Sequence, residues 1–181
     1  MPDTRPPPSA PQRRRALLFR AWLAGALVIV VLDQFSKAYV NSHLRYGQRL
    51  HVLPVFDITL LYNPGAAFSF LAEDGGWQRW LFTLIALGAA GLIIHLLRKN
   101  PGQTLFCASM MAILGGAVGN VTDRLQHGHV IDFLLFYWNN WYFPAFNIAD
   151  VSITCGAALL ILDEILRMRR ERGKTGSSPP S

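Results

Sequence analysis

Four long runs of apolar residues alternate with polar and charged segments along this chain. The runs cover residues 16–38, 80–97, 104–122 and 148–166. Each approaches the ~20 residues that an α-helix needs to cross the hydrocarbon core of a bilayer. The pattern therefore predicts one mainly α-helical membrane domain over residues 13–170, between disordered tails at 1–12 and 171–181.

The composition agrees with a membrane protein. Of the 181 residues, 51% are hydrophobic and only 15% are charged, whereas about 25% are charged in ordinary soluble domains. The net charge of +6 does not point to nucleic acid, because the basic residues gather near the chain ends and in one short loop. The clustered ones are Arg13, Arg14, Arg15, Arg98, Lys99, Arg167, Arg169, Arg170, Arg172 and Lys174. Four spans place all of them on one side, which predicts a multi-pass protein with both termini in the cytoplasm.

The two polar segments expected on the outer side differ in character. Residues 51–53 and 55–62 are rich in β-branched and aromatic side chains and precede a turn sequence at 63–65, which predicts short strands. Residues 136–143 are dense in aromatic side chains, which suits a segment that lies in the headgroup region.

Two carboxylates adjoin the apolar runs, where burying a charge is costly and usually marks a functional site. Asp132 follows two apolar residues in the second outer segment, and Asp150 lies near the start of the fourth run. If the fold brings them together, they can share one proton and activate a water, which is the chemistry of an aspartic protease. The alternative for Asp150 is that it caps the fourth helix.

Three asparagines lie at the outer ends of the predicted spans. Buried amides such as those of Asn120 and Asn147 can hold an extended peptide or orient a carboxylate. Asn63 can do the same, but Asn-Pro-Gly is also an ordinary turn sequence.

Charged residues near the same ends suggest ion pairs. Asp33 and Lys37 are four residues apart on one helix, so they can pair on one face. Arg124 can pair with Asp123, or it can reach a substrate carbonyl or a lipid phosphate.

Two other functions fit parts of the pattern. A zinc hydrolase could use His127, His129 and Asp132, although no fourth ligand is evident. An ion or proton transporter could line its path with the acidic residues. Transporters usually place such acids near the midplane and carry internal repeats, and this chain has its acids at one face and no repeat.

Five sequence blocks, taken together, resemble the lipoprotein signal peptidase family, the type II signal peptidases of bacteria. The blocks are D-Q-x-S-K at Asp33 to Lys37, N-x-G-x-A-F at Asn63 to Phe68, G-G-x-x-G-N-x-x-D-R at Gly115 to Arg124, V-x-D-F at Val130 to Phe133, and F-N-x-A-D at Phe146 to Asp150. All five occur in the order typical of the family.

The resemblance implies a membrane aspartyl endopeptidase of the bacterial inner membrane that needs no metal or cofactor. The implied fold is a bundle of four transmembrane helices with a small extracytoplasmic β-cradle and an interfacial helix, the latter around Trp138. The implied reaction removes the signal peptide of a prolipoprotein, before its diacylglyceryl-modified cysteine, near the outer face of the membrane.

The resemblance also implies roles for individual residues. Asp132 and Asp150 are expected to be the catalytic pair. The residues expected to bind the substrate or the inhibitor globomycin are Asn63, Asn120, Arg124 and Asn147. Those expected to support the site are Asp33, Lys37, Asp123 and Gly65.

Overall fold

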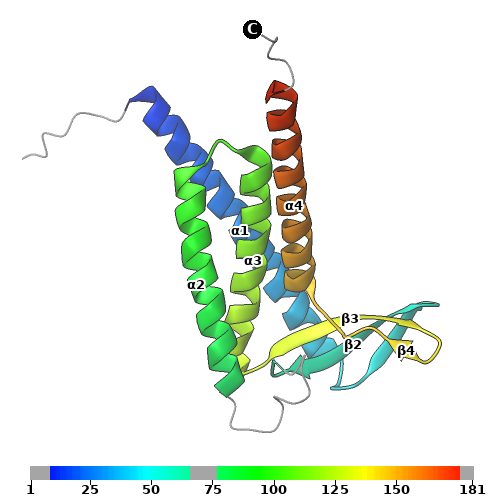
Figure 1. The fold of residues 1–181 in the computed structure, drawn as a ribbon. Coiled ribbons are helices and arrows are strands. Elements are labelled where there is room, and N and C mark those ends of the chain that lie inside the picture. The colour runs from blue at the N-terminus through cyan, green and yellow to red at the C-terminus, as the bar shows by residue number, and fades with distance from the viewer. Residues whose placement is uncertain (1–8, 66–76, 176–181) are drawn as a thin grey trace, which may run out of the picture.

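The computed structural model describes residues 9–65 and 77–175. The elements follow one another as α1 (Ala10–His43), β1 (Arg49–Leu53), β2 (Phe56–Asn63), α2 (Trp77–Lys99), α3 (Thr104–His127), β3 (Val130–Trp138), β4 (Trp141–Tyr142) and α4 (Ile148–Thr175). The helices stand side by side, and the strands gather at one end of them (Figure 1). Residues 1–8 and 176–181 of the expected tails, and 66–68 of the second sequence block, lie outside the described residues.

The helices run past the expected borders of the membrane domain. α1 already begins at Ala10, after Ser9, whose backbone N–H donates to Oε1 of Gln12 at 2.9 Å. α4 continues to Thr175, so residues 171–175 are helical where a tail was expected. Arginine and glutamate are good helix formers, and Arg167 pairs with Glu164 one turn away.

Three helices of the described chain are long and apolar enough to cross a membrane, namely α1, α2 and α3. They contain the first three predicted spans, and their outward faces carry large apolar side chains such as Leu84 and Leu92. The fourth predicted span lies in α4, which is 28 residues long. Because α4 holds Asp150, Asp163 and Glu164, its length and composition do not by themselves mark it as a span.

α3 packs against the three other helices, and two of its glycines allow a close approach to α1 and α4. A Cβ atom on Gly115 would lie 2.7 Å from Cβ of Ile29 on α1. A Cβ atom on Gly116 would overlap the backbone of Ala149 on α4. Small residues at these positions therefore let the backbones of three helices meet at the level of the polar cluster described below.

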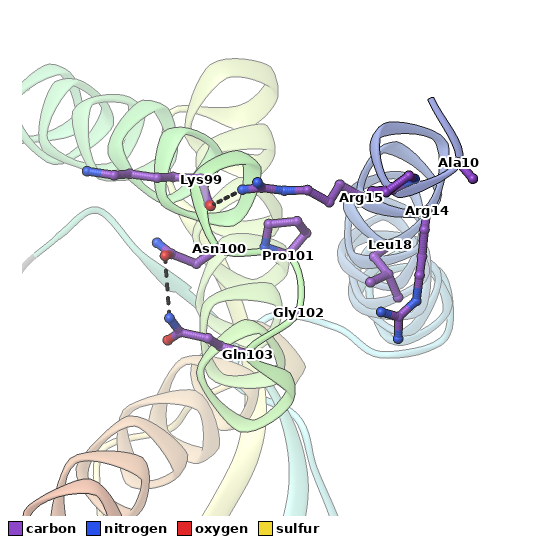
Figure 2. Close-up of a pocket in the computed structure, with 10 residues that line it drawn as sticks. Ala10, Arg14, Arg15, Leu18, Lys99, Asn100, Pro101, Gly102 and Gln103 are labelled. Carbon is purple, nitrogen blue, oxygen red and sulfur yellow. Dashed lines mark hydrogen bonds between the residues drawn. The ribbon is translucent and has the colours of Figure 1, made fainter. Parts of the chain in front are cut away.

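The end of the bundle away from the sheet is tied together by the loop between α2 and α3. The indole Nε1 of Trp22 donates to the carbonyl of Pro101 at 3.0 Å. The guanidinium of Arg15 donates to the carbonyl of Lys99 at 2.9 Å (Figure 2). Both donors lie on α1, so this helix is fixed to the α2–α3 loop at two levels.

The sheet confirms the strands that the sequence predicted in the first outer segment. It is antiparallel, with the order β1-β2-β3-β4. β2 and β3 pair with Leu61 opposite Asp132 and with Asn63 opposite Val130. This register brings the end of β2, where the Asn63 turn begins, beside the carboxylate on β3.

The aromatic segment at 136–143 is not the interfacial helix that the resemblance implied. β3 continues to Trp138, the chain turns at Asn139 with a positive φ of 51°, and β4 begins at Trp141. Aromatic side chains favour strands, and asparagine tolerates the left-handed conformation that a tight hairpin turn needs. Trp138 and Trp141 are 69% and 63% exposed at the hairpin tip. The segment therefore presents aromatic rings on the protein surface, although it is not a helix.

Candidate active site

Asp132 lies near the start of β3 and is almost completely buried, at 3% exposure. Its Oδ2 accepts a bond from Nδ2 of Asn63 at 3.0 Å, and its Oδ1 accepts one from Nδ2 of Asn147 at 2.7 Å. Burial raises the pKa of Asp132 from 3.8 to about 7, the bond from Asn63 opposes this shift, and the nearby charge of Asp150 adds to it. Asp132 is therefore a carboxyl group that can hold a proton near neutral pH.

Asp150 lies in the first turn of α4 and does cap that helix. Its Oδ2 accepts the backbone N–H of Asn147 at 3.2 Å, and the Asn147 side chain accepts the backbone N–H of Asp150 at 3.0 Å. This reciprocal pair satisfies two of the N–H groups that a helix start leaves free. The other oxygen, Oδ1, accepts a hydrogen bond from Nδ2 of Asn120 at 2.8 Å. The Asp150 carboxylate therefore caps the helix with one oxygen and takes part in the polar site with the other.

Asn147 joins the two aspartates. Its side-chain Nδ2 donates to Asp132, and its backbone N–H donates to Asp150. Asn147 itself is fully buried. The two carboxylates that the sequence separates are thus brought to one amide residue at the junction of β3 and α4.

Asn63 serves both of the roles that its sequence allowed. Its Oδ1 accepts the backbone N–H of Gly65 at 2.9 Å, which closes the turn, while its Nδ2 donates to Asp132. Gly65 has a φ of +103°, a conformation that side chains other than glycine's rarely adopt. The turn therefore aims the Asn63 amide at the carboxylate.

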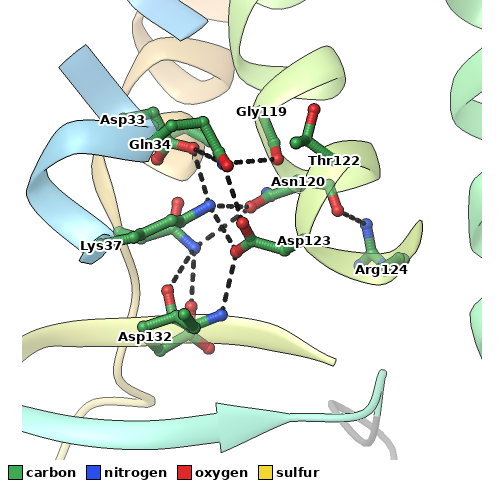
Figure 3. A network of polar contacts seen from close by, with 12 residues as sticks. Asp33, Gln34, Lys37, Gly119, Asn120, Thr122, Asp123, Arg124 and Asp132 are labelled. Atoms are coloured by element: carbon green, nitrogen blue, oxygen red, sulfur yellow. Dashed lines mark hydrogen bonds and ion pairs between the residues drawn. The ribbon is translucent and has the colours of Figure 1, made fainter. Parts of the chain in front are cut away.

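Lys37 lies at the centre of a buried charge cluster next to Asp132 (Figure 3). Its Nζ lies 2.7 Å from Oδ2 of Asp33 and 2.9 Å from Oδ2 of Asp123. It also donates to Oδ1 of Asn120 at 3.0 Å. The pairing of Lys37 with Asp33 is the i, i+4 contact that the sequence predicted, whereas the contact with Asp123 joins α1 to α3.

The two acids of this cluster also hold the backbone next to the aspartates. Asp33 accepts the N–H of Ala149 at 2.9 Å, and Asp123 accepts the N–H of Ile131 at 3.1 Å. Ala149 directly precedes Asp150, and Ile131 directly precedes Asp132. Each buried acid therefore fixes the main chain one residue before one member of the pair.

Arg124 lies at the edge of the site, near the end of α3, and forms no ion pair with Asp123. Its Nη1 donates weakly to the carbonyl of Asn120 at 3.4 Å, and its guanidinium lies 5.5 Å from the ring centroid of Phe82. Among the described residues, its Nε is a buried side-chain nitrogen without a hydrogen-bond partner. A buried donor in this state is available to a carbonyl group.

One further member of the network is Gln34, which the sequence analysis named only as a letter of the first block. Its Nε2 donates to Asp123 at 2.8 Å, to the carbonyl of Gly119 at 3.1 Å and to Asp33 at 3.2 Å. Its place directly after Asp33 was the available signal. Its position on the α1 face toward α3 depends on how the two helices pack.

The two histidines of the zinc alternative, His127 and His129, make ring contacts. The rings of His127 and His129 have centroids 6.0 Å apart, and His129 lies against the ring of Tyr62 with centroids 4.3 Å apart. Within the described residues, no group of three or more histidine, cysteine or acidic side chains is placed to hold a metal ion.

Two cavities adjoin the aspartates from different sides. One, of about 350 Å³, is lined by Tyr46, Leu61, Tyr62, Asn63, Pro64, Asp132, Pro144 and Ala145. The other, of about 320 Å³, is lined by Phe143, Phe146, Asp150, Val151, Thr154 and Cys155. Both are lined mainly by apolar groups. The first also includes the side chain of Asn63 at the end of β2, and the second lies between Phe143, Phe146 and the first turns of α4.

Comparison with known proteins identifies the family of this chain. A family model described as "Signal peptidase (SPase) II" matches residues 25–166. A lipoprotein signal peptidase of Cupriavidus pinatubonensis is 54% identical over 149 residues, which cover 82% of this chain and 85% of that protein. One of Neisseria meningitidis is 49% identical over 156 residues, covering 86% and 94%.

Two solved structures of bacterial membrane enzymes have a similar fold. One has a TM-score of 0.71 at 24% identity and covers 89% of this chain and 93% of its own. The other has a TM-score of 0.70 at 27% identity, with 78% and 90% covered. With its several apolar helices, the chain is a multi-pass membrane protein. It belongs to the signal peptidase II family, the membrane proteases that process prolipoproteins.

Proposed function

We propose that Asp132 and Asp150 are the catalytic pair with which this peptidase cleaves a prolipoprotein before its diacylglyceryl-modified cysteine. The observation that carries this proposal is the bridging position of Asn147, which donates to both carboxylates. The raised pKa of Asp132 supports it further, because an acid that keeps its proton near neutral pH suits general acid catalysis.

The proposed reaction uses one proton on the pair. A water attacks the scissile carbonyl carbon, Asp150 takes a proton from this water, and Asp132 gives its proton to the carbonyl oxygen. The tetrahedral intermediate then collapses. The C–N bond breaks, Asp150 passes its proton to the leaving nitrogen, and Asp132 regains a proton from a hydroxyl of the intermediate. The pair ends with one proton, as it began.

The neighbouring residues have distinct proposed roles. Asn63, Asn120 and Asn147 hold the carboxylates and, together with Arg124, contact the substrate backbone or a globomycin-type inhibitor. The Nε of Arg124, which has no hydrogen-bond partner among the residues that the structure describes, supports its part in this, since a substrate carbonyl would satisfy it. Lys37 and its two acids position the aspartates.

The proposed substrate position follows from the two cavities. The mainly apolar cavity beside Asp150 suits the apolar signal segment and acyl chains, which lie in membrane lipid. The cavity beside Asp132 and Asn63 offers backbone-binding groups for the extended chain around the scissile bond. The membrane would present the modified cysteine at this boundary.

We propose that α4 is the fourth transmembrane helix. It lies along α3 in Figure 1, and a Cβ atom on Gly156 of α4 would lie only 2.8 Å from the carbonyl oxygen of Ser109 on α3. Its outward apolar side chains include Ile161, 62% exposed, and Leu162, 44% exposed, which suit contact with lipid.

The proposed orientation follows from charge. The start of α1 and the end of α4 lie at the end of the bundle opposite the sheet, and so does the α2–α3 loop (Figure 1). Arginine and lysine residues are concentrated there. This supports cytoplasmic termini in the bacterial inner membrane and a catalytic pair near the outer face.

The test is cleavage of a diacylglyceryl-modified prolipoprotein in detergent, followed by gel shift. We expect Asp132→Asn and Asp150→Asn to lower turnover at least about a hundredfold while the proteins stay folded. The matched control is Asp57→Asn, because Asp57 is also buried but pairs with His51 on the neighbouring strand β1. Globomycin should block the wild type and the control. Substantial turnover by folded Asp150→Asn protein would overturn the proposed pair.

A further inference from the structure

Two neighbouring cavities lie at the end of the bundle opposite the catalytic pair. The larger, of about 690 Å³, lies between α1 and the α2–α3 loop (Figure 2). It is lined by Ala10, Pro11, Arg14, Arg15, Leu18, Lys99, Asn100, Pro101, Gly102 and Gln103. The smaller, of about 480 Å³, is lined by Gln12, Arg15, Ala16, Phe19, Arg20 and Arg98. Arg15 belongs to both cavities, so they form two halves of one basic site.

The described part of this site carries positive charge alone. Of the lining residues that the structure describes, five are basic and none is acidic. Within residues 9–65 and 77–175, none of these five forms an ion pair. Arg15 donates from Nη2 to the Lys99 carbonyl and thereby stays fixed across the gap between α1 and the loop. A built cavity with several free guanidinium N–H groups favours a phosphate ligand.

The arginines carry the argument rather than the lysine. In Figure 2 the Arg15 side chain reaches from α1 toward the loop, and the Arg14 side chain extends beside Leu18. The Lys99 side chain points away from α1 in the same view. The second cavity adds the guanidinium groups of Arg20 and Arg98 on the other side of Arg15.

Apolar side chains also line both cavities. Leu18 lines the larger cavity and Phe19 lines the smaller one. Leu17 of the same helical turn is 64% exposed. A ligand that joins phosphate groups to hydrocarbon chains would satisfy the arginines and cover these apolar groups at once, which a free phosphate ion would not do.

We propose that this site binds an anionic phospholipid with two phosphodiester groups, one in each cavity, with Arg15 between them. The lipid belongs to the leaflet opposite the catalytic pair. It joins α1 to the α2–α3 loop at a level where the protein itself supplies two hydrogen bonds, from Arg15 and Trp22. The lipid site depends on the fold and on these two cavities and is independent of the roles of Asp132 and Asp150.

The test is native mass spectrometry of the full chain released from detergent, with tetraoleoyl cardiolipin as the two-phosphate probe. Dioleoyl phosphatidylglycerol and dioleoyl phosphatidylethanolamine are the one-phosphate anionic and zwitterionic comparisons. We expect retention to follow the order cardiolipin, phosphatidylglycerol, phosphatidylethanolamine. Equal retention of the two anionic lipids would overturn the two-phosphate assignment.

A charge-matched pair of variants separates a site from general attraction. Arg14→Gln/Arg15→Gln/Arg98→Gln removes three charges from the cavities. Arg167→Gln/Arg169→Gln/Arg170→Gln removes three from exposed positions of α4 at the same end of the bundle. We expect cardiolipin affinity to fall on the order of tenfold or more in the first variant only. Equal losses in the two variants would show unspecific attraction and overturn the proposal.

Two further measurements keep the outcome clear. Circular dichroism of each variant must match the wild type, and an Arg15→Lys variant serves as a milder change if the triple variant fails to fold. Arg15→Lys keeps the charge but loses the planar fork, so cardiolipin should be retained less than by the wild type. Cardiolipin should stay bound in excess inorganic phosphate, and its release would show a site for free phosphate ions instead.

Discussion

Lys37 donates from Nζ to Oδ1 of Asn120 at 3.0 Å, and this bond decides which end of the Asn120 amide faces Asp150. Because Oδ1 points to the ammonium group, Nδ2 is directed at the carboxylate and donates to it at 2.8 Å. The same oxygen also accepts Nδ2 of Asn147 at 3.2 Å. A buried cation on α1 therefore orients a donor on α3 toward a carboxylate on α4.

Replacing Lys37 with methionine should destabilise the protein strongly. Methionine fills a similar volume but leaves Asp33 and Asp123 buried without their cation, so we expect a loss of about 3–5 kcal/mol in the free energy of unfolding. Thermal unfolding in detergent measures this. The control is Arg167→Met, which breaks an exposed pair with Glu164 worth about 0–1 kcal/mol. Similar losses for the two variants would contradict the central role of Lys37.

Replacing Asn120 with aspartate should impair cleavage more than folding. The new side chain has nearly the same shape but presents an oxygen in place of the Nδ2 that donates to Asp150. Losing a bond to a charged group costs about 1.5–3 kcal/mol, which corresponds to roughly ten- to a hundredfold in kcat/KM. Asn139→Asp, at the exposed hairpin turn, is the matched control and should cleave normally. Unchanged kcat/KM in Asn120→Asp would refute this assignment.

The rate of cleavage should fall as the pH rises through about 7. In this range Asp132, whose pKa burial raises to about 7, loses the proton that it gives to the scissile carbonyl. The proposed reaction needs one proton on the pair, so the profile should be bell-shaped, with its alkaline limb set by Asp132 near neutrality. The measurement is kcat/KM against pH with chemistry rate-limiting. A rate that stays constant from acid to alkaline pH speaks against a shared proton.

The stability of the wild type should decrease as the pH rises from about 4 to about 7. The raised pKa of Asp132 means that the folded state binds its proton more tightly than the unfolded state, whose value is near 3.8. Stability from this group is therefore present below pH 4 and is lost as the pH passes the folded value. Asparagine does not titrate, so the Asp132→Asn protein should not lose this contribution. The Tm of the variant minus that of the wild type should therefore increase from about pH 4 to about pH 7. Parallel Tm curves for the two proteins would show that burial does not act on Asp132 in this way.

Replacing Gly116 with alanine should loosen the contact between α3 and α4. The added Cβ would lie 2.8 Å from Cγ1 of Ile153 and would overlap the Ala149 backbone, whose N–H Asp33 holds. Overpacking of this kind costs typically 1–3 kcal/mol, seen as a lower Tm and lower activity. Gly88→Ala on α2 is the control, because no atom lies within 4 Å of its added Cβ. If Gly88→Ala lowers the Tm as much, helix contact is not the cause.

The sequence alone determined most elements of this protein and its family. Runs of apolar residues predicted the three helices that are long and apolar enough to cross a membrane. They could do so because helix length and apolar composition are properties of a local segment. The β-branched pattern predicted β2, and the i, i+4 spacing predicted the pair of Asp33 with Lys37. The sequence blocks predicted the family, which the comparisons confirmed.

Two outcomes differ from what the sequence analysis allowed. The interfacial helix that the resemblance implied around Trp138 is a hairpin, because β2 offers an edge with which β3 can pair. Of the two alternatives for Arg124, the ion pair with Asp123 does not form. Arg124, next to Asp123 in sequence, leaves that acid to Lys37, which lies on another helix. In both cases a partner far away in the chain decided the outcome.

Only the tertiary structure decided how the polar residues are connected. It placed Asn147 between Asp132 and Asp150, and it set the acids beside Lys37 against the backbone of Ile131 and Ala149. These contacts join residues of α1, α3, β3 and α4. They depend on the short distances between the helices that the glycines of α3 allow. Sequence periodicity describes one element at a time, so the relative shift and rotation of packed elements, and the hydrogen bonds that follow from them, become visible only in the folded chain.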